Sequence, residues 1–395
     1  MEKLYLVTLL LASFLTIACK KQSDNTSTNN YPAVKARFGN NIDLTNLQQY
    51  ANQSKPAYIN KDNAGINAIT DAKATLGRVL FYDKSLSIDN SISCGSCHKQ
   101  QFAFSDTALI SRGVQGGLTT RHSMRLINAR FAIENRFFWD ERAVTLEAQT
   151  TQPIKDHAEM GWSGQAGRPN FAALLTRLGS IDYYQELFAF VYGNTSITEQ
   201  KIQECLAAFI RSIQSFDSKF DIGRATAPND LVNFANYTPQ ENAGKQLFLQ
   251  APAFNAAGMR VAGGAGCQGC HRAPEFDIDT NSRNNGITNT ANNPGAPPQL
   301  NNTRSPTLRD LLNPMGQLNG NLMHSGAFAS LQGAINHYNN IVIHPLNNNL
   351  DGRLTPNGMG QKLQLTPTEM NNLMAFLATL TGSNVYTDKK WSDPF

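Results

Sequence analysis

The stretch "SISCGSCHKQ", residues 91–100, places two thiols three positions apart and an imidazole directly after the second thiol. The same spacing returns in "GCQGCHR" at 266–272. Two cysteines at this spacing can form a disulfide, and two such pairs can hold one zinc ion through four thiolates. Neither arrangement needs the adjacent histidine. The complete C-x-x-C-H pattern is typical of c-type haem attachment, so the sequence predicts two covalently bound haem c groups with their iron.

Each residue of the motif has a separate part in such an attachment. The thiols would bond to the two vinyl groups of a porphyrin, and the imidazole would lie under the iron as its proximal ligand. The predicted attachment residues are Cys94, Cys97 and His98 at the first site, and Cys267, Cys270 and His271 at the second.

Similar apolar segments flank both motifs. "LGRVLF" (76–81) precedes the first motif and "AGKQLF" (243–248) the second, and both resemble the start of an amphipathic helix. The segments 196–216 and 365–382 carry apolar residues at helical spacing near the end of each half. Each half thus reads as helix, haem motif, long insert and terminal helix. We therefore predict an all-α fold with two cytochrome c-like domains, each carrying one covalently bound haem.

Three of these helices begin with a predicted capping box, a hydroxyl and a carboxylate three residues apart that satisfy free N–H groups. The predicted pairs are Thr238 with Glu241, Ser196 with Glu199, and Thr366 with Glu369. Cys205 falls on the apolar face of the segment 196–216, where we expect a buried free thiol.

The first residues, "MEKLYLVTLLLASFLTIAC", form a short charged start and an apolar run that is too short for a membrane span. Ala18 before Cys19 resembles a bacterial lipoprotein cleavage box, although Thr16 stands where that box prefers leucine. A plain secretory signal with an incidental cysteine is the alternative. We predict a signal peptide at 1–18, lipidation at Cys19, and a place in the bacterial periplasm or cell envelope with contact to a membrane through the lipid anchor alone.

The remaining boundaries follow from the repeat. A polar tether and N-terminal extension are predicted at 19–59, the N-terminal cytochrome domain at 60–229 and the C-terminal one at 230–395. The net charge of +4 is small for 395 residues. Long basic runs and basic residues interleaved with aromatic ones are both missing from the sequence, so we expect no nucleic-acid partner.

The insert after the first motif, "FFWDERAVTLEAQTTQPIKDHAEMGW" (137–162), carries a specific pattern of tryptophan, aspartate, arginine, glutamine, proline and a Glu-Met pair. With "SPTLRD" (305–310) and "MHSGAFASLQGAINHY" (323–338), this pattern resembles the bacterial di-haem cytochrome c peroxidases and their relatives of the MauG type. The resemblance covers nearly the whole mature chain. It implies that the N-terminal domain is the peroxidatic one and that the C-terminal domain transfers electrons.

The resemblance also implies roles for residues of the insert. Glu159 is the distal acid-base group at the first haem, and Gln149 and Pro153 shape its distal pocket. Trp139 is an electron relay between the haems, although an aromatic run can equally be core. A carboxylate in a dry pocket suits proton transfer because burial raises its pKa toward neutrality. His157 is a weaker rival for the proton role.

The chain departs from the family in "GLTTRHSMRLIN" (117–128). Peroxidases that need reductive activation have a distal histidine eight residues before an asparagine of this stretch. Here His122 takes the asparagine place, and Val114 takes the place of the blocking histidine. We therefore expect the first haem to be open in the resting state. His122, together with Asn319 and Asn321 in the second contributing stretch, also makes the family's calcium ion possible but doubtful.

The sixth ligand of the second haem is a further expectation from the resemblance. In the peroxidases it is a methionine fourteen residues after a motif histidine, and in MauG-type proteins a tyrosine holds that place. Here the position is Tyr338, so we predict Tyr338 as an iron ligand, beside the proximal ligands His98 and His271. The alternatives are Met323, Met315 and His337.

The function that the resemblance implies is reduction of hydrogen peroxide to water by a cytochrome-c peroxidase, with electrons from a small c-type cytochrome or a cupredoxin. A MauG-like enzyme that oxidises a protein side chain through a high-valent di-haem state is the alternative within the class. A non-catalytic di-haem electron-transfer or sensor cytochrome is the alternative from another class, and Val114 and Glu159 argue against it.

Overall fold

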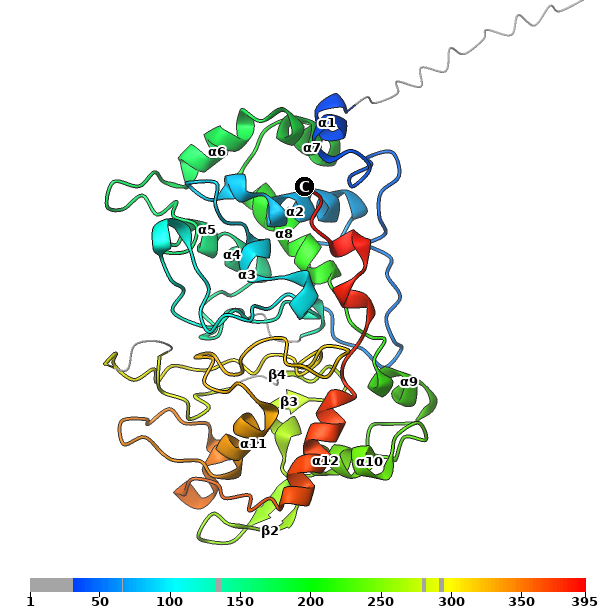
Figure 1. Ribbon diagram of the computed structural model, residues 1–395, viewed down its shortest axis with the longest axis vertical. Coiled ribbons are helices and arrows are strands. Elements are labelled where there is room, and N and C mark those ends of the chain that lie inside the picture. Colours follow the sequence, from blue (N-terminus) through cyan, green and yellow to red (C-terminus); the bar gives the residue numbers. More distant parts are fainter. Residues whose placement is uncertain (1–30, 66, 133–135, 279–281, 291–294) are drawn as a thin grey trace, which may run out of the picture.

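The computed structural model describes residues 31–395 apart from residue 66 and residues 133–135, 279–281 and 291–294. The predicted signal peptide and Cys19 lie outside the described residues. The chain is mainly helical and forms two halves, one above the other in Figure 1. None of the described helices is long and apolar enough to cross a membrane.

The upper half contains the first eight helices. They are α1 (Pro32–Phe38), α2 (Asp71–Tyr82), α3 (Cys94–Cys97), α4 (Leu146–Thr150), α5 (Gln152–Lys155), α6 (Phe171–Gly179), α7 (Asp182–Tyr192) and α8 (Glu199–Ser212).

The lower half contains four helices and four short strands. They are α9 (Lys219–Thr226), α10 (Pro239–Leu249), α11 (Leu331–Asn339), α12 (Pro367–Ala378), β1 (Pro252–Phe254), β2 (Arg260–Gly263), β3 (His271–Arg272) and β4 (Asp277–Ile278). Short 3-10 turns complete the described chain: η1 (Lys84–Leu86), η2 (Gln100–Phe102), η3 (Val114–Gly116), η4 (Ala129–Phe131), η5 (Cys267–Gly269), η6 (Gly352–Leu354), η7 (Pro356–Gly358), η8 (Asn384–Tyr386) and η9 (Lys389–Trp391).

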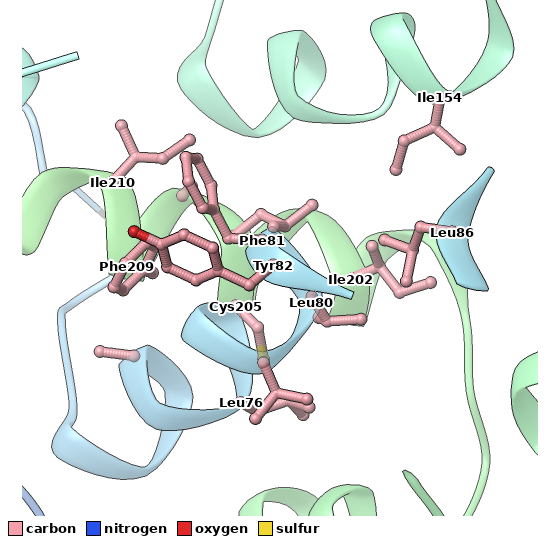
Figure 2. Packing of buried hydrophobic residues seen from close by; sticks show 14 of the residues in the cluster. Leu76, Leu80, Phe81, Tyr82, Leu86, Ile154, Ile202, Cys205, Phe209 and Ile210 are labelled. Atoms are coloured by element: carbon pink, nitrogen blue, oxygen red, sulfur yellow. The ribbon is translucent and has the colours of Figure 1, made fainter. Parts of the chain in front are cut away.

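The upper core is built on the crossing of α2 and α8. Leu76 and Phe81 of α2 interleave with Cys205 and Phe209 of α8, as Figure 2 shows, and all four are buried. Gly77 lies at the crossing, where an added Cβ would stand 2.0 Å from the carbonyl oxygen of Cys205. The predicted buried free thiol is therefore confirmed, and the glycine lets the two backbones approach closely.

The lower core repeats this crossing with α10 and α12. An added Cβ at Gly244 of α10 would stand 1.8 Å from the carbonyl oxygen of Asn372. Phe248 packs against Phe376 with ring centroids 5.2 Å apart, and Phe276 packs on both rings. The repeat predicted from "LGRVLF" and "AGKQLF" is thus the repeat of one helix crossing in each half.

Two of the three predicted capping boxes are present. Thr238 with Glu241 begins α10, and Thr366 with Glu369 begins α12. The third prediction is wrong, because α8 begins at Glu199 with Thr198 as its N-cap. The N–H of Ser196 donates to the side chain of Asn194 instead, in a turn that ends before the helix starts.

The all-α prediction needs one qualification. The lower half holds two two-stranded antiparallel sheets, β1 with β2 and β3 with β4. His271 pairs with Ile278 in the second sheet. The second C-x-x-C-H motif therefore ends in a strand, whereas the first ends at the C-cap of a helix.

The C-terminal segment returns from α12 to the upper half (Figure 1). Trp391 is buried in the upper core, and its indole N–H donates to Ser212 Oγ at 3.2 Å. The hydroxyl of Tyr82 donates to the carbonyl of Trp391 at 2.7 Å. Val34 and Phe38 of α1 belong to the same core. The upper core therefore uses residues from outside the predicted 60–229 segment.

Candidate functional site

The first cavity, called cavity 1, lies in the upper half and encloses about 70 Å³. It brings together the first motif and the predicted distal residues. They are Cys94, Cys97, His98, Gln149, Pro153 and Glu159. Gln149 comes from α4, which Thr145 caps, and Pro153 lies in the first turn of α5. Apolar side chains such as Phe81 and Ile210 complete the wall.

His98 is held in one tautomer. Its Nδ1 donates to the carbonyl oxygen of Phe104 at 3.0 Å, so Nε2 keeps its lone pair. Burial lowers the pKa of His98, which favours the neutral imidazole that a metal needs. Gly95 of the motif packs against Tyr82, whose ring would stand 2.5 Å from a Cβ at that position. The helix crossing thus fixes the motif in place.

Glu159 is held by its backbone at the rim of cavity 1. Its N–H donates to Asp156 Oδ1 at 2.9 Å, and its carbonyl accepts from Val114 N–H at 2.9 Å. Burial raises the pKa of the Glu159 carboxyl to about 7, with the charge of Asp156 adding to the shift and Arg142 opposing it. A carboxyl with this pKa can both take and give a proton near neutral pH.

The residues that could compete with Glu159 or block cavity 1 lie elsewhere. Val114 is fully buried and does not line the cavity. Gly113 before it packs so closely on Ala158 that an added Cβ would stand 1.8 Å from that carbonyl oxygen. His157 points to Ser163, at 2.9 Å between Nδ1 and Oγ, and is not among the residues of the cavity wall.

The second cavity, called cavity 2, lies mainly in the lower half and encloses about 610 Å³. Cys267, Cys270 and His271 form part of its wall. His271 Nδ1 donates to the carbonyl oxygen of Pro306 at 3.0 Å, so its Nε2 also keeps a lone pair. Burial lowers the pKa of His271 to about 4. The two predicted proximal histidines, His98 and His271, thus share one feature: in each, Nδ1 donates to a backbone carbonyl.

Of the four candidates for the sixth ligand, two reach cavity 2. Tyr338 of α11 and Met323 both line it, with Tyr338 Oη 4.0 Å from Met323 Sδ. Burial raises the pKa of Tyr338 well above its ordinary value. Met315 is 77% exposed, and His337 Nε2 donates to the carbonyl of Asn285 at 2.9 Å. Tyr338 and Met323 are therefore the two candidates that lie in the wall of cavity 2.

One segment, residues 119–126, runs between the two cavities and is called the strap. Thr119 and Leu126 line cavity 1, whereas His122 and Arg125 line cavity 2. Trp139 also lines cavity 2, and its indole N–H donates to the carbonyl of His122 at 2.7 Å. The predicted relay residue is thus bonded to the segment that both cavities share.

The strap also joins the two halves. The N–H of His122 donates to the carbonyl of His324 at 2.8 Å, and the His324 ring lies 6.2 Å from the Trp139 ring. His122 Nδ1 lies 3.0 Å from the carbonyl of Ala108, and its buried Nε2 has no hydrogen-bond partner among the described residues. Within the same residues no group of three or more His, Cys, Asp and Glu side chains could hold a metal ion. Calcium here stays a prediction.

The thiols and imidazoles of the two motifs fit a c-type haem better than they fit a disulfide or a zinc site. The four motif cysteines are not joined in disulfides, and the two pairs line separate cavities, so they do not form one four-thiolate zinc site. Each pair stands beside one buried imidazole whose Nδ1 donates to a backbone carbonyl. Cavity 2 has the size of an ordinary cofactor site. Cavity 1 is much smaller, so its side chains must move apart for a porphyrin to enter.

Sequence reasoning missed the charged walls of the cavities. The exposed Arg112 borders cavity 1. The arginines that line cavity 2 are Arg125, Arg272, Arg283, Arg304 and Arg353. They come from separate segments with no shared spacing, so the sequence carries no motif that would have grouped them.

Comparison with known proteins shows which family and which structures the chain is similar to. The family described as di-haem cytochrome c peroxidase matches residues 71–226. The methylamine utilization protein MauG of Methylophilus methylotrophus is 28% identical over 322 residues, which cover 80% of this chain and 84% of that protein. The cytochrome c551 peroxidase of Nitrosomonas europaea is 25% identical over 329 residues, 80% of this chain and 83% of its own.

A solved structure agrees with these relatives. The crystal structure of a MauG-like protein associated with microbial copper homeostasis superposes with a TM-score of 0.66 at 27% identity, and covers 87% of this chain and 99% of its own. The sequence motifs, the two cavities and the relatives thus agree in their likeness to the di-haem cytochrome c peroxidases and MauG proteins. Residues 71–226 match the di-haem cytochrome c peroxidase family, and most of the chain is similar to MauG and to the cytochrome c551 peroxidase.

Proposed function

We propose that the protein is a di-haem c-type peroxidase that reduces hydrogen peroxide to water. The reaction takes two electrons and two protons for each peroxide and yields two water molecules. The observation that carries the proposal is Glu159, a carboxyl with a pKa of about 7 in the same cavity as His98, Cys94 and Cys97. When bound, a haem in that cavity supplies the iron at which peroxide is reduced.

The residues of cavity 1 have distinct parts in this reaction. His98, fixed by its bond to Phe104, would be the residue of cavity 1 that holds the iron. Glu159 takes a proton from one peroxide oxygen and returns it to the other, because its pKa lies close to the working pH. Gln149 and Pro153 form the wall beside it and limit access of bulk water. Val114 is apolar and lies outside the lining of cavity 1, so it would not compete with peroxide there.

Electrons would enter through the lower half. Tyr338 and His271 would hold the second iron from opposite sides of cavity 2. Trp139 would carry electrons toward cavity 1, because its indole is oxidisable and is bonded to the strap between the cavities. The donor would be a small c-type cytochrome or a cupredoxin. We also propose that the mature chain begins at a lipidated Cys19 in the periplasm or cell envelope.

The test is the variant Glu159→Gln, which keeps the size of the side chain and removes its acid-base chemistry. We expect both haems to attach as in the wild type, and peroxide turnover to fall at least about a hundredfold. Stopped-flow mixing of the ferric protein with peroxide measures this. A matched control is Glu199→Gln, on a carboxyl that lies outside both cavities. Turnover at the wild-type rate in Glu159→Gln contradicts the proposal.

A second function is favoured by Tyr338. MauG-type proteins oxidise a protein side chain, and a tyrosine stands at this place in them. Tyr338 lines cavity 2 here. The two functions differ in the electron donor, which is a small redox protein in one case and a side chain of a larger partner in the other. Rapid peroxide turnover with a small cytochrome c favours the first, and turnover that needs a protein substrate favours the second.

A further inference from the structure

Arg125 brings a charged group to the wall of cavity 2 that none of the proposed roles uses. Its Nη2 donates to the carbonyl of Thr307 at 3.0 Å. Its Nε is buried and has no hydrogen-bond partner among the described residues. A guanidinium that is withdrawn from water without an anion beside it is costly, because several kcal/mol of hydration are lost for each buried ion. Arg125 therefore requires a negative partner.

The acid whose charge acts on Arg125 does not supply that partner. The charge of Asp310 acts on Arg125, but no ion pair joins the two side chains within the described part of the chain. Asp310 Oδ1 instead accepts from the N–H of Gly382 at 2.8 Å and from the hydroxyl of Tyr386 at 3.1 Å. Burial lowers the pKa of Arg125 to about 10, which agrees with a cation that is incompletely compensated.

The rest of the cavity wall points to an anion inside cavity 2. Among the described residues, five arginines line it, whereas Asp351 is the one acidic residue in that lining. Asp351 already binds Arg353, with Nη2 and Oδ2 2.6 Å apart. Arg304 binds Asp277 at 3.2 Å. Arg304 and Arg353 are thus paired, whereas the Nε of Arg125 has no partner among the described residues. A porphyrin of the haem type carries two carboxylate side chains.

We propose that Arg125 forms a charge-assisted hydrogen-bonded pair with a carboxylate of the porphyrin in cavity 2. This rests on the haem assignment in the proposed function. The pair would satisfy the unpartnered Nε or the neighbouring nitrogens, and would compensate both buried charges at once. Because Arg125 belongs to the strap, the same contact would attach the wall of cavity 1 to the cofactor of cavity 2.

The pair has a measurable electrostatic effect. A cation beside the cofactor disfavours the ferric state, in which the iron carries one more positive charge. Removing Arg125 leaves the carboxylate uncompensated, so the reduction potential of the haem on His271 should fall. The haem on His98 should change less, because Arg125 is not among the residues that line cavity 1.

The experiment is a redox titration of three variants, followed optically in the absence of peroxide. Arg125→Gln should lower the potential of the haem on His271 by about 59 mV or more, a tenfold change in a one-electron equilibrium. Arg125→Lys should shift it by less than half as much, because it keeps the charge. Arg121→Gln is the matched control, since Arg121 lies on the same strap, binds Asp140 at 2.8 Å and does not line cavity 2.

The outcomes separate this inference from the proposed function. If Arg125→Gln attaches both haems and shifts the potential no more than Arg121→Gln, the pair with the carboxylate is refuted. If the wild-type protein attaches no haem at all, the proposed function fails instead. If Arg125→Gln does not fold, a crystal structure of the wild-type holoprotein shows whether Arg125 contacts a porphyrin carboxylate. It should place an Arg125 nitrogen within about 3.2 Å of a porphyrin carboxylate oxygen, and an ion pair with Asp310 in its place overturns the inference.

Discussion

At the scale of single residues, the proposed function depends on how the fold changes the acidity of Glu159. Burial raises its pKa to about 7, so the carboxyl is mostly protonated below that pH and mostly ionised above it. The ionised form is the one that can accept a proton from peroxide. The neighbouring histidine His157, which faces Ser163 outside the cavity, cannot take over this part.

We therefore predict that peroxide turnover depends on pH in a particular direction. The rate should be flat above about pH 7 and should fall about tenfold for each pH unit below it, because the protonated carboxyl is not a base. A profile of the rate between pH 5 and pH 9, at saturating donor, measures this. In Glu159→Gln the acidic limb should disappear. A wild-type profile that stays flat through pH 7 is incompatible with Glu159 as the base.

A second prediction at this scale concerns the ligand in cavity 2. Tyr338→Phe should change the ferric absorption and EPR spectrum of the haem on His271, because the oxygen ligand is removed. Met323→Leu is the control, since Met323 Sδ lies 4.0 Å from Tyr338 Oη in the same wall. If Met323→Leu alters the spectrum and Tyr338→Phe leaves it unchanged, the sixth ligand is Met323.

The two C-x-x-C-H motifs could be read from the sequence because their spacing is local. The place of Glu159 in cavity 1 was expected from the family pattern, and the structure brings Glu159, Gln149 and Pro153 together with His98 there. The role of Arg125 had no such signal. It depends on a cavity wall assembled from distant segments, and no spacing along the chain encodes that arrangement.

At the scale of the elements, one helix crossing repeats in each half. Gly77 allows α2 to meet α8, and Gly244 allows α10 to meet α12. The apolar periodicity of these segments made the helices predictable, together with two of their capping boxes. The small sheets were not predictable, because β3 and β4 are only two residues each and alternate too briefly to show a pattern.

We predict that Gly77→Ala destabilises the upper half. The new Cβ would stand 2.0 Å from the carbonyl oxygen of Cys205, so α2 and α8 would have to move apart. Overpacking of this kind costs about 1–3 kcal/mol of unfolding free energy. Gly179→Ala in α6 is the control, because no atom lies within 4 Å of its added Cβ. Denaturation in urea compares the two, and equal stability of both variants contradicts the close approach.

At the scale of the whole molecule, the two halves are not independent. Cavity 2 is lined by residues of both, because His122, Arg125 and Trp139 come from the N-terminal half of the chain. The C-terminal segment returns to pack Trp391 into the upper core. The predicted division at 229 and 230 follows the sequence repeat, but a repeat cannot show that a terminal segment crosses back.

A mutation in the last five residues should therefore weaken the first half. We predict that Trp391→Ala lowers the free energy of unfolding by about 3–5 kcal/mol, because a large buried side chain is removed. Hydrogen exchange should accelerate in α2 and α8 rather than in α10 and α12. Val342→Ala, at a residue that is 73% exposed, should change stability by less than about 0.5 kcal/mol. Faster exchange confined to α10 and α12 would contradict this assignment.

The return of the C-terminal segment has a consequence for how the polypeptide is made. The upper core cannot be completed before residue 391 has been synthesised, since Trp391 packs into it. Any copy that stops before residue 391 would leave the upper core unfinished, even with both C-x-x-C-H motifs already translated. For the same reason, an affinity tag for purification fused behind Phe395 would sit beside α1 and the first core, rather than at a remote end.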